Sequence, residues 1–176
     1  MTKRIAILID GSNFYFKLKN LNLSNQLKFD FKALNDYLVE SNVLVSATYY
    51  IGAVKTDGSK KLDRLLSSQQ KLLNHLLKCD YRYSLGYLLK SDKGFSEKGV
   101  DVSMAVDILI NSYENLVDKI ILLSSDTDLI PAIKQSRKLG KLVEYIGFSH
   151  LPSRALERNC NTFKLFDKKD LLRFLL

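Results

Sequence analysis

Five short, almost continuously apolar runs constrain the fold of this chain more than any other feature. They span residues 5–9, 47–51, 83–89, 120–123 and 142–146. A strand that is buried on both faces needs apolar residues without interruption, whereas a strand with one wet face alternates. The runs therefore predict a mainly parallel sheet of about five strands, with helices on both faces.

Segments with helical spacing separate these runs. Residues 60–78 place seven leucines on one stripe, which predicts a core-facing helix and leaves a homodimer surface as the alternative. Residues 100–113 are apolar nearly all round and predict a heavily buried helix. Residues 94–99 resemble a loop. The alternation of strand and helix predicts a single doubly wound α/β domain over residues 1–176.

Composition excludes several classes of protein. Hydrophobic residues make up 46% and charged residues 26%, as in globular proteins rather than disordered ones. No apolar run approaches the ~20 residues that span a bilayer, so no membrane association is expected. Residues 5–9 are too few for a signal peptide, and Asp10 follows them in place of a cleavage site, so a cytoplasmic protein is expected.

Charge is distributed unevenly along a chain of net charge +8. Residues 101–133 contain one Lys or Arg against six Asp and Glu, and the segments on both sides are basic. A basic surface favours a polyanionic partner through counterion release, although lysines also keep a surface soluble. The acidic segment would repel a polyanion unless a cation is bound there. Nucleic acid binding and simple solubility both remain open.

Four aspartates are expected to meet at one edge of the sheet. Asp10 ends the first apolar run, Asp126 and Asp128 follow the fourth, and Asp101 begins a predicted helix. In open α/β sheets, ligands bind beyond the carboxyl ends of the strands. Gathered carboxylates repel one another, and proton sharing or a bound cation relieves the repulsion. We predict that the four hold Mg²⁺ or Mn²⁺, hard ions that prefer oxygen ligands and can activate water for phosphodiester hydrolysis.

Each aspartate also has a structural interpretation. Asp10 and either Asp126 or Asp128 could cap helices, and Asp101 could bind free amides at a helix start. Capping explains less readily why three separate segments bring aspartates to one edge. Asp107 lies about 240° around the helix from Asp101. We treat it as a provisional metal ligand that would approach from another side. It could instead hydrogen-bond to a metal ligand, or it could pair with a buried amide or base.

Five polar side chains near the aspartates are candidate substrate-binding groups: Asn13, Ser12, Lys98, Ser124 and Thr127. The asparagine could donate to a phosphate or a metal-bound water, or it could close the turn. The three hydroxyls could hydrogen-bond to ligand carboxylates or to phosphate, although hydroxyls in such turns usually bond to nearby backbone. The lysine could pair with a phosphate, although a loop lysine is commonly solvated. The glycine-rich phosphate loops of dinucleotide and nucleoside triphosphate sites are absent from the sequence.

Three segments carry a specific combination of motifs. They are Ile7 to Asn13 (ILIDGSN), Lys98 to Val102 (KGVDV) with Asp107 following, and Leu122 to Leu129 (LLSSDTDL). Together they resemble the NYN domain family, and in particular its LabA-like branch, within the PIN-like nuclease superfamily. Two positions depart from the family pattern, with Ser125 in place of glycine and Leu129 in place of an aromatic residue.

The resemblance implies a Rossmann-like PIN fold and metal-dependent RNA cleavage. By matching position, the metal-binding and catalytic acids would be Asp10, Asp101, Asp126 and Asp128, with Asn13 beside them. The leading hypothesis is therefore an endoribonuclease that uses Mg²⁺ or Mn²⁺ and acts on single-stranded or structured RNA. One alternative is a catalytically weak or inactive module of the same fold that binds RNA or a partner protein. The other is a phosphatase or nucleotidase that acts on small phosphate esters. Candidate contacts to the RNA backbone are Lys60, Lys61, Arg64, Lys90, Lys93, Lys134, Arg137 and Lys138.

Overall fold

The computed structural model describes residues 2–55, 58–91 and 94–176, and the side chains of residues 88–97 lie outside this description. In the described chain, seven strands form one sheet in the order β4-β3-β2-β1-β5-β6-β7. Neighbouring strands are parallel except β3 and β4, which are antiparallel. The strands are β1 (Arg4–Asp10), β2 (Val43–Gly52), β3 (Arg82–Ser91), β4 (Gly94–Lys98), β5 (Lys119–Leu123), β6 (Leu142–Phe148) and β7 (Thr162–Phe166).

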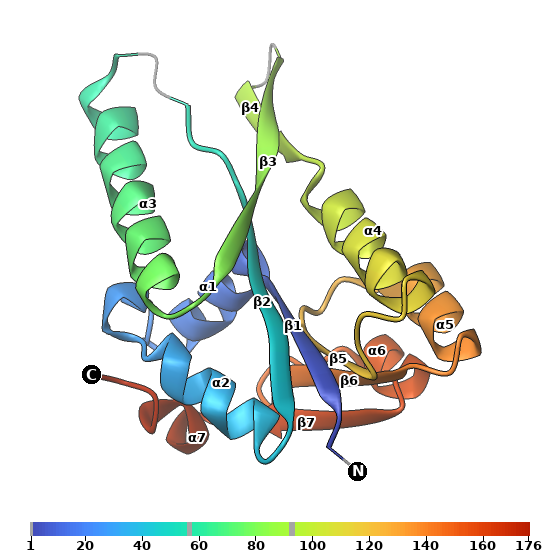
Figure 1. Ribbon diagram of the computed structural model, residues 1–176. Helices are drawn as coiled ribbons and strands as arrows, with labels where there is room; N and C mark the ends of the chain where they lie inside the picture. The colour runs from blue at the N-terminus through green and yellow to red at the C-terminus, as the bar shows by residue number, and fades with distance from the viewer. Residues whose placement is uncertain (1, 56–57, 92–93) are drawn as a thin grey trace.

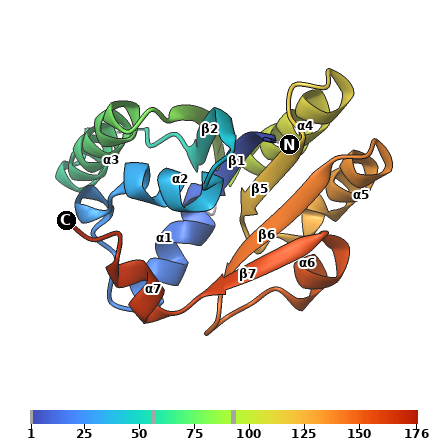
Figure 2. The ribbon, with the colours of Figure 1, turned by 60° about the horizontal axis from the view of Figure 1, so that its bottom comes forward.

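Helices cover both faces of the sheet, as predicted. Figures 1 and 2 show α1, α2, α3 and α7 on one face and α4, α5 and α6 on the other. The α-helices are α1 (Gly11–Asn20), α2 (Phe31–Val39), α3 (Lys60–Lys78), α4 (Val100–Tyr113), α5 (Ile130–Lys138), α6 (Arg154–Asn159) and α7 (Lys168–Leu172). Two 3₁₀ turns, η1 (Gln26–Lys28) and η2 (Thr127–Leu129), complete the described elements.

Strand β1 shows why the apolar runs are continuous. Its residues Ile5, Ile7 and Ile9 pack into the core beneath α1, α2 and α3. The intervening Ala6 and Leu8 pack into a second core beneath α4 and α5. Successive side chains of a strand point to opposite faces, so a strand with a core on each side has no position for a solvated residue.

Two strands were not predicted, and both lie at edges of the sheet. Residues 94–99 were expected to form a loop, but β4 occupies most of them and pairs with β3, with Tyr87 opposite Lys98. The other addition is β7, which pairs with β6 alone. The loop prediction was wrong because an edge strand pairs through its backbone and needs no continuous apolar run.

The two longest helices are less buried than their sequences indicated. In α4, Val102 is 66% exposed and Tyr113 is 61% exposed, so the prediction of a heavily buried helix was wrong. Only one stripe of α4, which includes Met104 and Ile108, faces the core. In α3 the leucine stripe divides, because Leu72, Leu73 and Leu76 are buried whereas Leu65, Leu66 and Leu77 are exposed.

The sheet has a topological switch point between β1 and β5. From β1 the chain proceeds to β2 on one side, whereas β5 lies on the other side of β1. Helices of the two halves cover opposite faces of the sheet (Figure 2). In doubly wound sheets this position holds the ligand.

Candidate acidic site

The carboxyl ends of β1 and β5 are joined by hydrogen bonds around Asp10. This aspartate ends β1 and is only 6% exposed. Its Oδ1 accepts a hydrogen bond from the backbone N–H of Asn13 at 2.9 Å, so it caps α1. Its Oδ2 accepts a hydrogen bond at 3.0 Å from the hydroxyl of Ser124, which directly follows β5. The capping and gathering interpretations of Asp10 therefore both hold.

Ser124 also fixes the loop that carries the next two aspartates. The Ser124 hydroxyl is buried and accepts a hydrogen bond from the backbone N–H of Asp126 at 3.0 Å. Asp126 in turn accepts one from the backbone N–H of Asp128 at 2.9 Å and caps η2. A single serine hydroxyl thus connects the carboxylate of β1 to the loop after β5. A hydrogen bond from Ser124 to one of the aspartates was among the expectations from the sequence, and the structure shows that Asp10 is the acceptor.

Asp101 reaches the same place from α4. Burial raises the pKa of Asp101, and repulsion by Asp126 and Asp10, a hydrogen bond with Asp126 and repulsion by Asp128 raise it further. Asp101 is therefore within electrostatic reach of the other three carboxylates, and within hydrogen-bonding reach of Asp126. We call Asp10, Asp101, Asp126 and Asp128 the aspartate set.

The chemistry of the aspartate set fits a hard divalent cation, because all its donors are carboxylate oxygens. Its geometry is more open than a formed metal site. Within the described ranges, no three His, Cys, Asp or Glu side chains are arranged so that they could hold a metal ion. The structure therefore brings together the four acids named from the sequence, and the metal itself remains a prediction.

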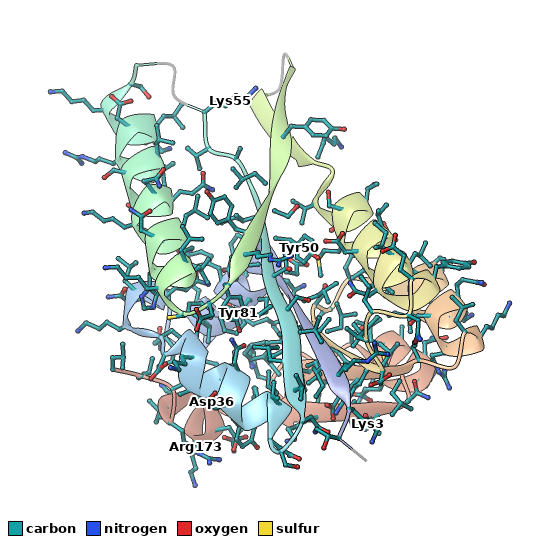
Figure 3. All side chains as sticks on the ribbon, viewed as in Figure 1. Lys3, Asp36, Tyr50, Lys55, Tyr81 and Arg173 are labelled. Carbon is teal, nitrogen blue, oxygen red and sulfur yellow. The ribbon has the colours of Figure 1, made fainter. Side chains whose placement is uncertain are left out.

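Asp107 lies in a different environment, on the side of α4 that faces β2. Its Oδ2 accepts a hydrogen bond from the hydroxyl of Tyr50 at 2.5 Å. Tyr50 is the β2 residue opposite Asp10 in the sheet register, and Figure 3 places it between β2 and α4. Burial and this carboxylate both raise the pKa of Tyr50. Asp107 therefore has a buried tyrosine hydroxyl as its partner. This is close to one of the alternatives expected for it, pairing with a buried amide or base.

The remaining polar candidates lie around the same edge. Ser12 and Asn13 begin α1 and are half-buried, and Thr127 begins η2 and is exposed. Lys98 ends β4 and is exposed. The backbone N–H of Asn13 donates a hydrogen bond to Asp10. The side chains of these four residues remain candidates for contact with a ligand.

Gly11 brings α1 unusually close to β2. A Cβ atom at this position would lie 2.3 Å from the ring of Tyr49 and 2.7 Å from the backbone oxygen of Tyr50. The Tyr49 hydroxyl lies 3.3 Å from the Gly11 oxygen and 3.0 Å from Nε2 of Gln26, which is also buried. Glycine is therefore required here for packing, and the two tyrosines next to it were not singled out from the sequence.

The basic candidates divide into two groups on opposite faces of the sheet. Lys60, Lys61 and Arg64 line a cavity at the N-terminal end of α3. A second cavity, on α5, is lined by Lys134, Arg137, Lys138 and Asn161. The side chains of Lys90 and Lys93 lie outside the described residues.

The sequence matches a protein family and a curated relative. The family model of the NYN domain matches residues 4–167. An uncharacterized protein of Methanocaldococcus jannaschii is 28% identical over 154 residues, which cover 88% of this chain and 51% of that protein. The chain therefore spans about half the length of this curated relative.

A solved structure has the same fold. A protein of unknown function from Vibrio parahaemolyticus superposes with a TM-score of 0.74 at 23% sequence identity, covering 99% of this chain and 97% of that one. At this identity the likeness concerns the fold alone. Among the described residues, no helix combines the length and apolar character needed to cross a membrane.

Proposed function

The chain belongs to the NYN domain family, and on this basis we propose that it is a metal-dependent endoribonuclease acting at the aspartate set. The family has a nuclease-type fold, and RNA is the substrate that this fold suggests. The observation that carries the proposal is the hydrogen-bonded connection of Asp10 through Ser124 to Asp126 at the switch point, with Asp101 beside it.

The protein's own contribution is to hold these carboxylates in place before a substrate arrives. Asp10 and Asp126 each use one oxygen to accept a backbone N–H, and Asp10 also accepts the Ser124 hydroxyl. Asp101 approaches from α4, so the acids come from both sides of the switch point. A bound Mg²⁺ or Mn²⁺ would supply a water of lowered pKa and stabilise the negative charge that develops on the phosphodiester.

The test is a cleavage assay on labelled single-stranded and structured RNA, with Mg²⁺, with Mn²⁺ or with EDTA. Asp126→Asn should lower cleavage roughly 100-fold or more, the scale of losing a preorganised charged group. Asparagine can still cap η2, so circular dichroism and thermal unfolding should stay near those of the wild type.

Asp36→Asn is the matched control. It makes the same change of charge at an exposed position of α2 (Figure 3). Cleavage that is insensitive to EDTA, or equal in Asp126→Asn and Asp36→Asn, would contradict the proposal.

One observation favours a second candidate, an RNA-binding module of the same fold without catalysis. The described residues hold no preformed three-ligand metal site. The discriminating result is tight RNA binding by pure protein with no turnover in Mg²⁺ or Mn²⁺ on any of these substrates.

A further inference from the structure

A groove lies between α1 and α3, on the side of the sheet that α1 covers. Its lining includes Gly11 and Ser12, which directly follow Asp10 at the start of α1. It continues past Ile51 and Val54 at the end of β2 and is closed by one face of α3. The groove has a volume of about 670 Å³, within the ~300–1,000 Å³ typical of small-molecule sites. We call it the α1–α3 groove.

Two aromatic rings of α1 line this groove and remain accessible. Tyr15 is 37% exposed and Phe16 is 59% exposed. Their ring centroids lie 5.4 Å apart, with an interplanar angle of 68°. The rings of Phe14 on the same helix and of Phe29 and Phe31 are buried in the core, so α1 places its aromatic residues on two different sides. Exposed rings in a concave site are suited to stacking against a flat ligand.

Cations lie at the far end of the groove. Leu65 and Ser68 of α3 line both the α1–α3 groove and the neighbouring cavity that contains Lys60, Lys61 and Arg64. That cavity has a volume of about 490 Å³. The two hollows therefore adjoin each other, with the aromatic rings in one and the positive charges in the other.

Gln69 fixes the wall of this path. Its side-chain amide donates to the backbone oxygen of Gly52 at 2.7 Å and accepts from the backbone N–H of Val54 at 2.9 Å. These two bonds attach α3 to the end of β2, so the hollow lies between elements that are held together.

We infer that the α1–α3 groove binds unpaired nucleobases of single-stranded RNA, with Tyr15 and Phe16 as stacking surfaces and the α3 cations on the neighbouring phosphates. This inference rests on the proposed function, because the aspartate set marks where the scissile phosphodiester would lie. Aromatic rings beside a basic path are the usual means of binding single strands. In a duplex the base faces are covered by their neighbours, so the groove selects unpaired segments.

The chain contains no tryptophan, which permits a direct measurement. Phe16→Trp introduces the only tryptophan of the chain into the groove, where it can be excited selectively over tyrosine, and keeps an aromatic surface. Titration with a single-stranded RNA oligonucleotide in EDTA should quench its emission, whereas a fully paired RNA hairpin should quench it far less. The matched control is Phe163→Trp on β7, where the native phenylalanine is 50% exposed and lies outside the groove.

A binding series separates stacking from charge. By fluorescence anisotropy in EDTA, Phe16→Ala should weaken binding of the single-stranded oligonucleotide about 5- to 100-fold, the range for loss of one base–aromatic stack. An oligonucleotide of the same length with abasic sites should bind Phe16→Ala and wild type equally. Phe163→Ala should behave as wild type. Equal quenching at positions 16 and 163, or equal weakening with abasic and normal RNA, would overturn the inference.

These measurements do not depend on cleavage. If the groove variants respond as expected but no metal-dependent turnover is found, the endoribonuclease proposal fails and the groove stands. If turnover is found but the fluorophore in the groove does not respond, the groove inference fails alone.

Discussion

Helices α3 and α4 flank the aspartate set from opposite faces of the sheet and differ in what they offer a ligand. Both expose apolar side chains, such as Leu65 on α3 and Val102 on α4. The exposed face of α3 lines a groove and carries cations at its first turns. By contrast, α4 contributes two acids, Asp101 and Asp107, and its sequence contains no Lys or Arg.

This difference indicates that the two helices would contribute different properties to the proposed site. The α4 flank completes the acidic set, and the α3 flank supplies shape, aromatic surface and positive charge. A polyanion is therefore attracted along one side and meets the carboxylates at the switch point. The comparison can be tested by changing each flank separately.

The largest expected effect is on the α4 flank, at Asp101. Asp101→Asn should lower RNA cleavage roughly 100-fold or more, because a charge that contributes to the reaction centre is lost. Asp107→Asn keeps an acceptor for the Tyr50 hydroxyl and should retain cleavage within a few-fold of the wild type. Initial rates at saturating Mg²⁺ measure both. Equal losses in the two variants would place Asp107 in the aspartate set.

A smaller loss is expected where the flanks meet, at Ser124. Ser124→Ala removes the hydroxyl that donates to Asp10 and accepts from the Asp126 N–H. Cleavage should fall about 10- to 100-fold, as for groups that orient metal ligands. Unfolding free energy should fall by about 1–3 kcal/mol, because buried polar partners are left unsatisfied.

Ser125→Ala is the control for this change. Among the described residues, its hydroxyl makes one long contact, 3.4 Å, to the Tyr145 hydroxyl. Urea unfolding and initial rates for the two variants should separate clearly, and identical results would show that the Ser124 connection is unimportant.

The smallest effect is expected from charge on the α3 flank. The triple substitution Lys60→Ala, Lys61→Ala and Arg64→Ala should make single-stranded RNA binding less dependent on salt. Each lost phosphate contact lowers the magnitude of the slope of log K against log salt concentration by ~0.7, so three lost contacts lower it by up to about 2. The comparable triple change on α5, at Lys134, Arg137 and Lys138, should alter the slope less, since α5 lies on the other face of the sheet. A larger change from α5 would reverse the comparison of the flanks.

The central strands were predictable because they are buried on both faces, so almost every residue in them is apolar. In β1 and β5 both faces are buried, and the apolar run ends where the strand ends, at Asp10 and Leu123. The edge strands β4 and β7 were not predicted, since pairing on one side leaves a weaker pattern. The degree of burial of α3 and α4 was overestimated because a leucine or valine indicates suitability for a core without showing that a core covers it.

The acids of the site were predictable individually, and a bond from Ser124 to one of them was an open possibility, but the atoms that each residue joins were not predictable. Asp10, Asp101, Asp126 and Asp128 were chosen from strand ends and a helix start, and the structure gathers them. The pairing of Asp107 with Tyr50 required the register of β2 against β1. No local signal marks Tyr50, because a tyrosine in an apolar run resembles any other core residue.

The sequence by itself determined the strand periods, the helix faces and the four acids that follow from where those elements begin and end. These features depend on neighbours a few residues away, and local chemistry fixes them. Only the tertiary structure decided that one serine hydroxyl joins Asp10 to the loop after β5, across 114 residues of chain. It also decided that α1 and α3 enclose a groove beside the acids, because a hollow exists only once separate helices pack on the same face of a sheet.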